Sequence, residues 1–163
     1  MRGLIGQEAD MPGSWPPDDF PNLSDSDYIE TGPKTRRYNC IAWAAGDTLR
    51  KWWPGPRGIG YWPPNISRET TVEAFIRAYG ALGYVSCADG SYEPGFQKVA
   101  LFAEKGVDGE LTPTHAAVQL QNGHWSSKLG DFEDVEHFAL EVLNGPRNGP
   151  RYGGVVRYLK RKA

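Results

Sequence analysis

The dipeptide Asn122-Gly123 constrains the fold of this chain more than any other short stretch. Both central residues of a type I′ turn need a positive φ, and Asn and Gly tolerate that conformation best. The dipeptide separates two segments with recurring apolar residues, 115–121 and 124–129. The sequence therefore predicts two antiparallel strands joined by a tight hairpin.

A two-residue turn would set the register of this hairpin by placing Gln121 opposite His124. Side chains alternate between the faces of a sheet, so each strand contributes every second residue to each face. One face would be core and carry Ala116, Val118, Leu120, Trp125 and Leu129. The other would look toward a cleft or solvent and carry His115, Ala117, Gln119, Ser126 and Lys128. A bulge would reverse the parity and bring Ser127 to the His115 face.

Two helices are expected before the hairpin. In residues 39–52 apolar and small residues recur with helical spacing, and Asn39 is a competent N-cap that places Cys40 in the first turn. In residues 70–82 the apolar residues again share one helical face, and Thr70 begins a capping-box pattern. These two helices precede most of the predicted strands.

The remaining segments complete the expected organisation. Further strands are predicted at residues 98–104 and 154–159, and the aromatic, Pro-rich segment 52–65 is predicted to be an ordered loop. Helices first and strands later predict an α+β fold, in which N-terminal helices pack on a small antiparallel sheet. Residues 1–37 are rich in Pro and Asp and are expected to form an arm before one domain at 38–163.

Composition excludes several classes of function. A formal net charge of −2 provides no broad attraction for phosphate backbones, so no nucleic-acid partner is expected. Two cysteines and three histidines, without metal-ligand spacing, predict no metal and no cofactor. The chain has no long apolar run and no signal-peptide pattern near its N-terminus. We therefore expect a soluble protein without a membrane partner, cytoplasmic or exported by a leaderless route, and the sequence predicts no oligomeric state.

Cys40 and His115 are the candidate catalytic pair. A thiol in the first turn of a helix lies near unpaired backbone N–H groups, which stabilise a thiolate and a developing oxyanion. Imidazole, with an ordinary pKa of ~6.5, is the side chain best suited to accept the thiol proton. His115 begins a strand that is expected to pack beside the Cys40 helix. The pair predicts nucleophilic attack by Cys40 on an amide or thioester carbonyl.

The order of these features resembles the papain-like cysteine peptidase superfamily. The segments THAAV (114–118) and WSS (125–127), around the Asn-Gly turn, are most similar to the compact cell-wall amidases of the NlpC type. The blocks NCIAWA (39–44), WSSKLG (125–130) and DVEH (134–137) also resemble an uncharacterised bacterial domain family. The resemblance implies a papain-like fold and a cysteine peptidase, amidase, deamidase or acyltransferase. Its substrate would be a protein, a peptide or a peptidoglycan-like polymer.

The resemblance also implies supporting site residues. The amidases carry Asp-Cys-Ser-Gly at the nucleophile, whereas this chain has Asn39 before its cysteine and lacks the upstream Gln of the peptidases. Asn39 is therefore the candidate oxyanion residue. Alignment with the amidases indicates Ser127 as the third catalytic residue. Asp134, or Asp131, is the alternative group that would orient the imidazole.

Each of these residues also has an ordinary structural interpretation. Cysteine is among the most buried residue types, so Cys40 also fits a core position, and Cys87 is interpreted as structural. His115 also fits a strand-end histidine bonded to a carbonyl. His124 and His137 are interpreted as surface residues, one beside a turn and one in an acidic stretch.

Two rival functions remain open at this level. The first is a non-catalytic binding or interaction module on the same scaffold, with the aromatic segment as its contact surface. The second is a component of a larger assembly, whose Pro-rich arm orders on a partner. The aromatic side chains of residues 43–62 fit a sugar or peptide groove and also fit packing over a small core, and packing is the commoner case.

Overall fold

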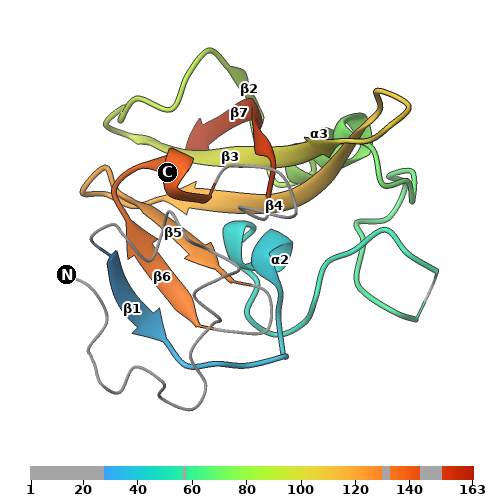
Figure 1. The fold of residues 1–163 in the computed structure, drawn as a ribbon, viewed down its shortest axis with the longest axis horizontal. Coiled ribbons are helices and arrows are strands. Elements are labelled where there is room, and N and C mark those ends of the chain that lie inside the picture. Colours follow the sequence, from blue (N-terminus) through green and yellow to red (C-terminus); the bar gives the residue numbers. More distant parts are fainter. Residues whose placement is uncertain (1–27, 57, 130–132, 144–151) are drawn as a thin grey trace.

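One antiparallel sheet organises the chain (Figure 1). The computed structural model describes residues 28–56, 58–129, 133–143 and 152–163. Within them the sheet has seven strands in the order β1-β6-β5-β4-β3-β7-β2. The strands are β1 (Tyr28–Gly32), β2 (Val85–Cys87), β3 (Phe96–Lys105), β4 (Leu111–Gln119), β5 (Trp125–Lys128), β6 (Asp134–His137) and β7 (Gly154–Lys162).

The helices are short. They are α2 (Cys40–Ala44), α3 (Val72–Gly80) and the 3₁₀ segment η2 (Leu140–Leu143). The first helix ends eight residues earlier than expected because Gly46 turns the chain at φ +84°, and the Asp47 side chain then accepts from Leu49 N. The second helix is confirmed, although Thr71 caps it, accepting from Ala74 N, in place of Thr70.

The predicted α+β fold is wrong, because the protein is mainly β. The strands predicted at 98–104 and 154–159 are present, but three more lay outside the prediction: β1, β2 and β6. Each is short, and each of these edge or near-edge strands is ordered by a distant partner. Tyr28 of β1 pairs with His137 of β6, and Val85 of β2 pairs with Lys160 of β7. Pairing over such separations leaves no local pattern in the sequence.

The arm expected at residues 1–37 lies partly outside the described residues. Its described end joins the domain, because residues 28–32 form β1. Farther on, the Thr35 carbonyl accepts a hydrogen bond of 2.9 Å from Lys128 Nζ. The end of this segment is therefore held against the sheet.

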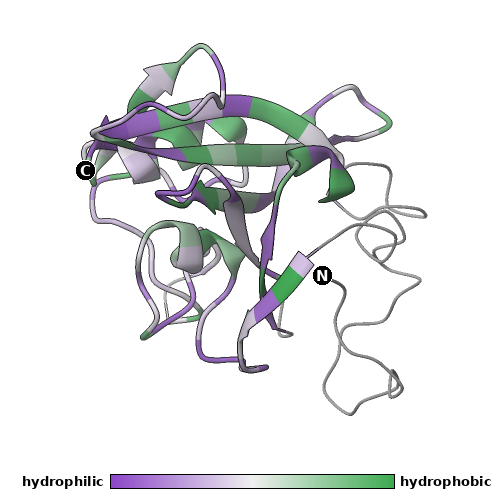
Figure 2. Cartoon of the chain, turned by 90° about the vertical axis from the view of Figure 1, so that its left-hand side faces the viewer, coloured by the Kyte–Doolittle hydropathy of each residue, from purple (hydrophilic) through white to green (hydrophobic). Residues whose placement is uncertain are grey.

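Both faces of the sheet are buried. The first hydrophobic cluster lies between the sheet and the two helices and includes Ile41, Phe75 and Val118. The second lies on the opposite face, where Phe102 and Ala117 pack with η2 residues. Figure 2 shows apolar residues recurring along the strands of the sheet. The expectation that the His115 face looks toward a cleft or solvent is therefore wrong.

The β4–β5 hairpin is antiparallel as predicted, but its register differs by one residue. Gln119 pairs with Trp125, and Leu120 N donates to the His124 carbonyl at 2.7 Å, which leaves a three-residue loop. Gly123 has φ +88°, whereas Asn122 instead accepts from His124 N through its side chain. The glycine therefore supplies the positive φ alone, as in hairpins with a G1 bulge.

Compared with the register expected from a two-residue turn, this register places each side chain of β5 on the opposite face of the sheet. Ser126 pairs with Val118 and lies on the helix side, where its Oγ accepts from Trp43 Nε1 at 3.0 Å. Lys128 shares that side, and Ser127 lies on the side of His115. The parity expected from a two-residue turn is wrong for all four residues of β5, because Trp125 also packs in the second cluster with Ala117.

The aromatic segment is ordered and used mainly for packing. Trp52 and Trp62 are each 3% exposed. Trp52 stacks on Tyr79 with ring centroids 6.4 Å apart, and Trp62 meets Phe75 edge-on at 5.0 Å. These rings complete the first cluster over the short helices. Within the described ranges, no helix has the length and apolar character needed to cross a membrane.

Candidate functional site

Cys40 occupies the first turn of α2, as predicted, and Asn39 is its N-cap. Asn39 Oδ1 accepts from Ala42 N and from Trp52 N, both at 3.1 Å. Its Nδ2 donates to the Trp52 carbonyl at 2.8 Å. Both ends of the Asn39 side chain are therefore used to cap the helix and hold the aromatic segment, so neither points freely toward a substrate oxyanion.

The Cys40 thiol is buried. It is 7% exposed, and Sγ lies 3.9 Å from the Thr114 carbonyl. Burial raises the pKa of Cys40 to about 11, despite opposing effects from backbone N–H groups, of which Ala116 is the largest, and from Lys128. The thiol is therefore protonated at neutral pH, contrary to what a nucleophile needs.

His115 lies on the other face of the sheet. Cys40 packs in the first cluster with Ala116, while His115, the preceding residue of β4, stacks on Tyr152 with centroids 4.1 Å apart. It is fully buried, and neither ring nitrogen has a hydrogen-bond partner. Burial, with a smaller effect of His137, lowers the pKa of His115 well below its ordinary value. The structure does not bring Cys40 and His115 together.

Ser127 instead meets His137, a residue that the sequence indicated as a surface histidine. Ser127 Oγ lies 2.9 Å from His137 Nε2, and His137 Nδ1 lies 2.9 Å from the Ala139 carbonyl. The carbonyl accepts only, so Nδ1 carries the proton and Ser127 donates to Nε2. Neither side chain is exposed, which denies a substrate access to the pair.

His137 could have been found from alternation along β6. Val135 is fully buried, and His137, two residues further, shares its face of the strand. The surrounding acidic residues hide this pattern, because Asp134 and Glu136 lie on the opposite face and give the segment a solvated composition. The interpretation of His137 as a surface residue is wrong.

Asp134 lies on the helix side of the sheet and contacts Tyr38. Tyr38 OH donates to Asp134 Oδ2 at 2.9 Å. Burial raises the pKa of Asp134, and burial together with this bond raises the pKa of Tyr38 to about 12. Lys128 Nζ lies 5.4 Å from the centroid of the Tyr38 ring. Asp134 therefore holds Tyr38 and not the His115 imidazole, while Asp131 lies outside the described residues.

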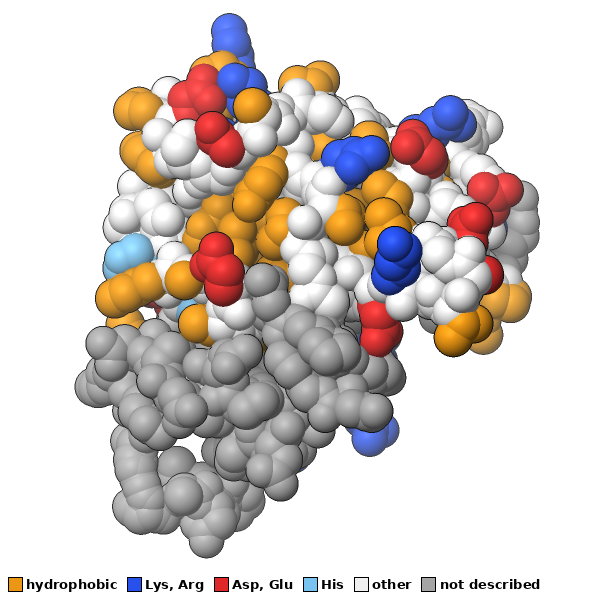
Figure 3. Space-filling view, turned by 45° about the horizontal axis from the view of Figure 1, so that its top comes forward, with side chains coloured by type: hydrophobic (Ala, Val, Ile, Leu, Met, Phe, Trp, Pro, Cys, Tyr) orange, Lys and Arg blue, Asp and Glu red, His pale blue; other side chains and the backbone are white. Residues whose placement is uncertain are grey.

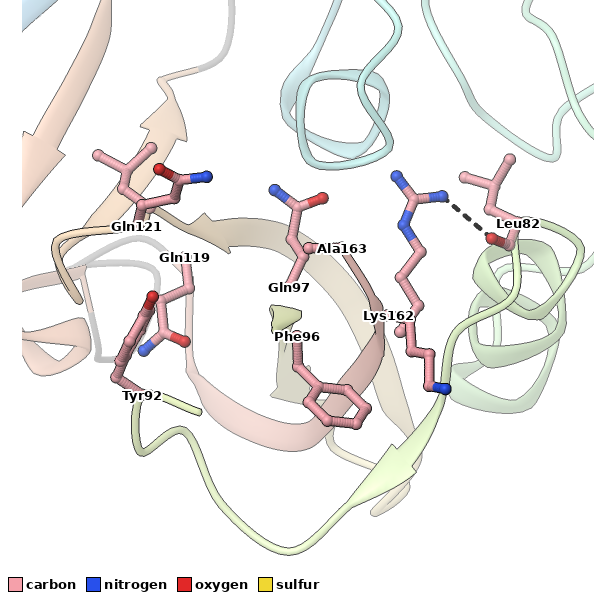
Figure 4. Close-up of a pocket in the computed structure, with 10 residues that line it drawn as sticks. Leu82, Tyr92, Phe96, Gln97, Gln119, Gln121, Lys162 and Ala163 are labelled. Atoms are coloured by element: carbon pink, nitrogen blue, oxygen red, sulfur yellow. Dashed lines mark hydrogen bonds between the residues drawn. The ribbon is translucent and has the colours of Figure 1, made fainter. Parts of the chain in front are cut away.

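A pocket lies at one end of the sheet, where β3 begins and β4 and β7 end (Figure 4). Its volume is about 460 Å³. It is lined by Leu82, Tyr92, Phe96, Gln97, Gln119, Leu120, Gln121, Arg161, Lys162 and Ala163. No candidate residue of the Cys–His site takes part. Across the described part of the chain, no three His, Cys, Asp or Glu side chains are grouped to hold a metal.

The polar groups of this pocket come from neighbouring strands. Gln97 of β3 pairs with Arg161 of β7, and Phe96 pairs with Lys162. Arg161 is anchored, because Nη1 donates to the Leu82 carbonyl at 3.0 Å. Phe96, Lys162 and Gln119 lie on one face of the sheet, and Gln97 and Arg161 lie on the other, so the pocket is lined by groups from both faces at the strand ends. No sequence signal marked the pocket, because it is formed by strand ends that only the register brings together.

The charge around the pocket differs from that of the wider surface. On the face seen in Figure 3, acidic and basic side chains are interspersed. The pocket lining has Arg161 and Lys162 and no acidic side chain. The pocket is therefore locally basic in a chain whose net charge is −2.

Comparison with known proteins places the chain in a family. No curated protein and no solved structure matches it. The resemblance to papain-like peptidases therefore stays a prediction from the sequence. One family, described as Domain of unknown function (DUF7689), matches residues 29–160, from β1 to near the end of β7. This match spans most of the 163 residues, so the chain belongs to the DUF7689 family.

Proposed function

We propose that this chain is a non-catalytic binding domain that takes a small polar ligand in the pocket at the sheet end. The observation that carries the proposal is a pocket of about 460 Å³ whose lining combines glutamine and cationic side chains with apolar ones. Ligand sites in proteins combine apolar walls with a few placed polar groups. Here Leu82, Phe96 and Leu120 are the apolar wall.

The state of the thiol favours this proposal over a Cys–His hydrolase. Cys40 has a pKa raised to about 11, and His115 packs in the opposite cluster with no polar partner. A general base has to reach the proton that it abstracts. Ser127 and His137 are in contact but fully buried, so a substrate could not reach them as an alternative nucleophile and base.

The aromatic segment is a weaker binding surface than the pocket. Two of its three tryptophans, Trp52 and Trp62, are buried in the first cluster and present little area to a partner, and the third, Trp53, packs partly buried against the same cluster. The pocket, in contrast, contains an acceptor that lacks a donor, Gln119 Oε1. An unpaired buried polar atom is unusual and is frequently found where a ligand or water binds.

The test is a fragment titration followed by NMR. Neutral, anionic and cationic fragments of amino-acid size are added to the ¹⁵N-labelled chain, and shifts of the Gln97 and Gln119 side-chain amides are recorded. Gln121→Trp narrows the pocket, and Glu110→Trp, at the far hairpin between β3 and β4, is the matched control. We expect some fragments to shift the NMR signals of the pocket amides. This binding should be lost in the Gln121→Trp variant and should persist in the Glu110→Trp variant. Shifts confined to other regions, or none, would refute the proposal.

A further inference from the structure

We infer that the pocket selects ligands that carry a carboxylate next to an amide N–H, the chemistry shared by an N-acylated amino acid and a peptide C-terminus. This inference rests on the proposed binding function and names its ligand class. Three features of one face of the pocket carry it: the Lys162 ammonium, an acceptor without a donor, and the Phe96 ring beside them.

Lys162 lines the pocket, and no Asp or Glu side chain is part of the lining. Lys162 has no hydrogen bond or ion pair to another side chain in the described part of the chain. Arg161 lies on the other face of β7, where Nη1 donates to the Leu82 carbonyl and Cζ lies 4.7 Å from the centroid of the Tyr84 ring. The nearby Glu93 is already neutralised, with Lys160 Nζ at 3.0 Å and Lys98 Nζ at 3.6 Å. An anionic group is therefore the favoured occupant of this end of the pocket.

The required donor follows from Gln119. This residue is 5% exposed, and its Nε2 is held by the Gly90 carbonyl at 2.8 Å, which fixes the orientation of the amide. Its Oε1 is buried without a partner. Figure 4 shows Gln119 beside Tyr92, a residue of the pocket lining that is 44% exposed. A ligand N–H that enters there would satisfy the carbonyl oxygen.

The register places these groups on adjacent positions. Phe96 and Lys162 are cross-strand partners, so their side chains start roughly 5 Å apart on one face. Gln119 lies on the same face of the next strand, as alternation from Val118 requires. A carboxylate at Lys162, an N–H at Gln119 and an apolar side chain against Phe96 therefore suit one small ligand.

The test compares ligands that differ in one group. N-acetyl-phenylalanine has the carboxylate and the N–H, its carboxamide lacks the charge, and O-acetyl-phenyllactate lacks the N–H. We expect the dissociation constant, measured by NMR titration, to rise about tenfold or more for each analogue. A tripeptide ending in Phe, compared with free N-acetyl-phenylalanine, distinguishes a peptide terminus from a free acyl amino acid.

Variants assign the two contacts. Lys162→Gln should weaken the binding of N-acetyl-phenylalanine and leave the binding of its carboxamide unchanged. Gln119→Leu should make N-acetyl-phenylalanine and O-acetyl-phenyllactate bind with equal affinity. Lys105→Gln, at the other end of β3, is the control and should change neither. Pocket binding with equal affinity for all three analogues would overturn this inference while the binding function stands. Absence of any fragment in the pocket would overturn both.

Discussion

Ser127 Oγ and His137 Nε2 are joined by a hydrogen bond of 2.9 Å inside the core of the sheet. The second ring nitrogen of His137 donates to the Ala139 carbonyl, so the imidazole is neutral and fully used. Burial lowers the pKa of His137 to about 4. His115, also buried on this face, has a pKa shifted in the same direction. Two neutral histidines in one core make the fold sensitive to acid.

The free energy of unfolding should fall as the pH drops from about 6.5 to about 4. In this range the unfolded chain binds a proton at His137 and the folded chain does not. The stabilisation is complete above pH 6.5 and is lost as pH falls toward the folded pKa. A difference between 6.5 and about 4, at about 1.4 kcal/mol per unit, corresponds to about 3 kcal/mol. Urea unfolding at several pH values measures it.

The matched variants separate His137 from the other titrating groups. His137→Gln should flatten the pH dependence between pH 7 and 4.5. His124→Gln removes a partly exposed histidine that pairs with Glu136 at 2.7 Å and should leave the His137 contribution in place. An unchanged slope in His137→Gln would show that this imidazole is not buried and neutral.

Cys40 should react slowly with iodoacetamide at neutral pH. A pKa raised from 9.0 to about 11 lowers the thiolate fraction about a hundredfold, and burial slows the reagent further. Cys87, which is partly exposed, is the internal control and should be labelled first. Mass spectrometry of labelling against pH checks both sites. If Cys40 were instead labelled rapidly, and if this reactivity were lost in His115→Ala, the result would support the Cys–His hydrolase hypothesis.

Asn39→Ala should destabilise the chain by about 2–3 kcal/mol. The change removes the N-cap of α2, worth about 1 kcal/mol, and leaves N–H and carbonyl groups of the buried Trp52 without their partner. Thr71→Ala removes only the N-cap bond to Ala74 N and should cost about 1 kcal/mol. If urea unfolding shows that Asn39→Ala and Thr71→Ala lose equal free energy of unfolding, Asn39 does not hold the aromatic segment.

Gly153→Ala should cost about 3 kcal/mol or more. Gly153 has φ +71°, and a Cβ there would collide with the carbonyl oxygen of Ala103 in the neighbouring strand. Gly46→Ala is the control, because its φ is +84° but its Cβ would meet open space, so only the backbone term of about 1 kcal/mol applies. Thermal unfolding of both variants separates the cost of the collision from the cost of backbone strain. Similar melting temperatures for the two variants would contradict the collision.

The candidate site was predictable only in its local parts. The position of Cys40 after a helix N-cap follows from Asn39 and its neighbours, and the structure has both. The side of β4 on which His115 lies depends on where β4 pairs and which face α2 covers. Ser127 lies on the face opposite to the one that a two-residue turn predicts, because the hairpin loop contains one more residue. Alternation turns such a shift by one residue into an exchange of whole faces.

The sequence by itself determined the elements that local chemistry specifies. These are the helix α3, the long strands β3 and β7, and an antiparallel hairpin at Asn122-Gly123. Their signals come from residues that contact one another within a few positions of the chain. The arrangement of those elements has no such signal.

Tertiary structure alone decided the mainly β fold, the separation of Cys40 from His115, and the pocket. β1 pairs with β6 and β2 with β7 across more than seventy residues, so propensity at these short segments could not reveal them. The burial of His115 and His137 depends on layers that cover both faces of the sheet. Gln119 shares a face of the sheet with Lys162 only through the register of three strands, because strand pairing and packing join residues that the chain itself keeps apart.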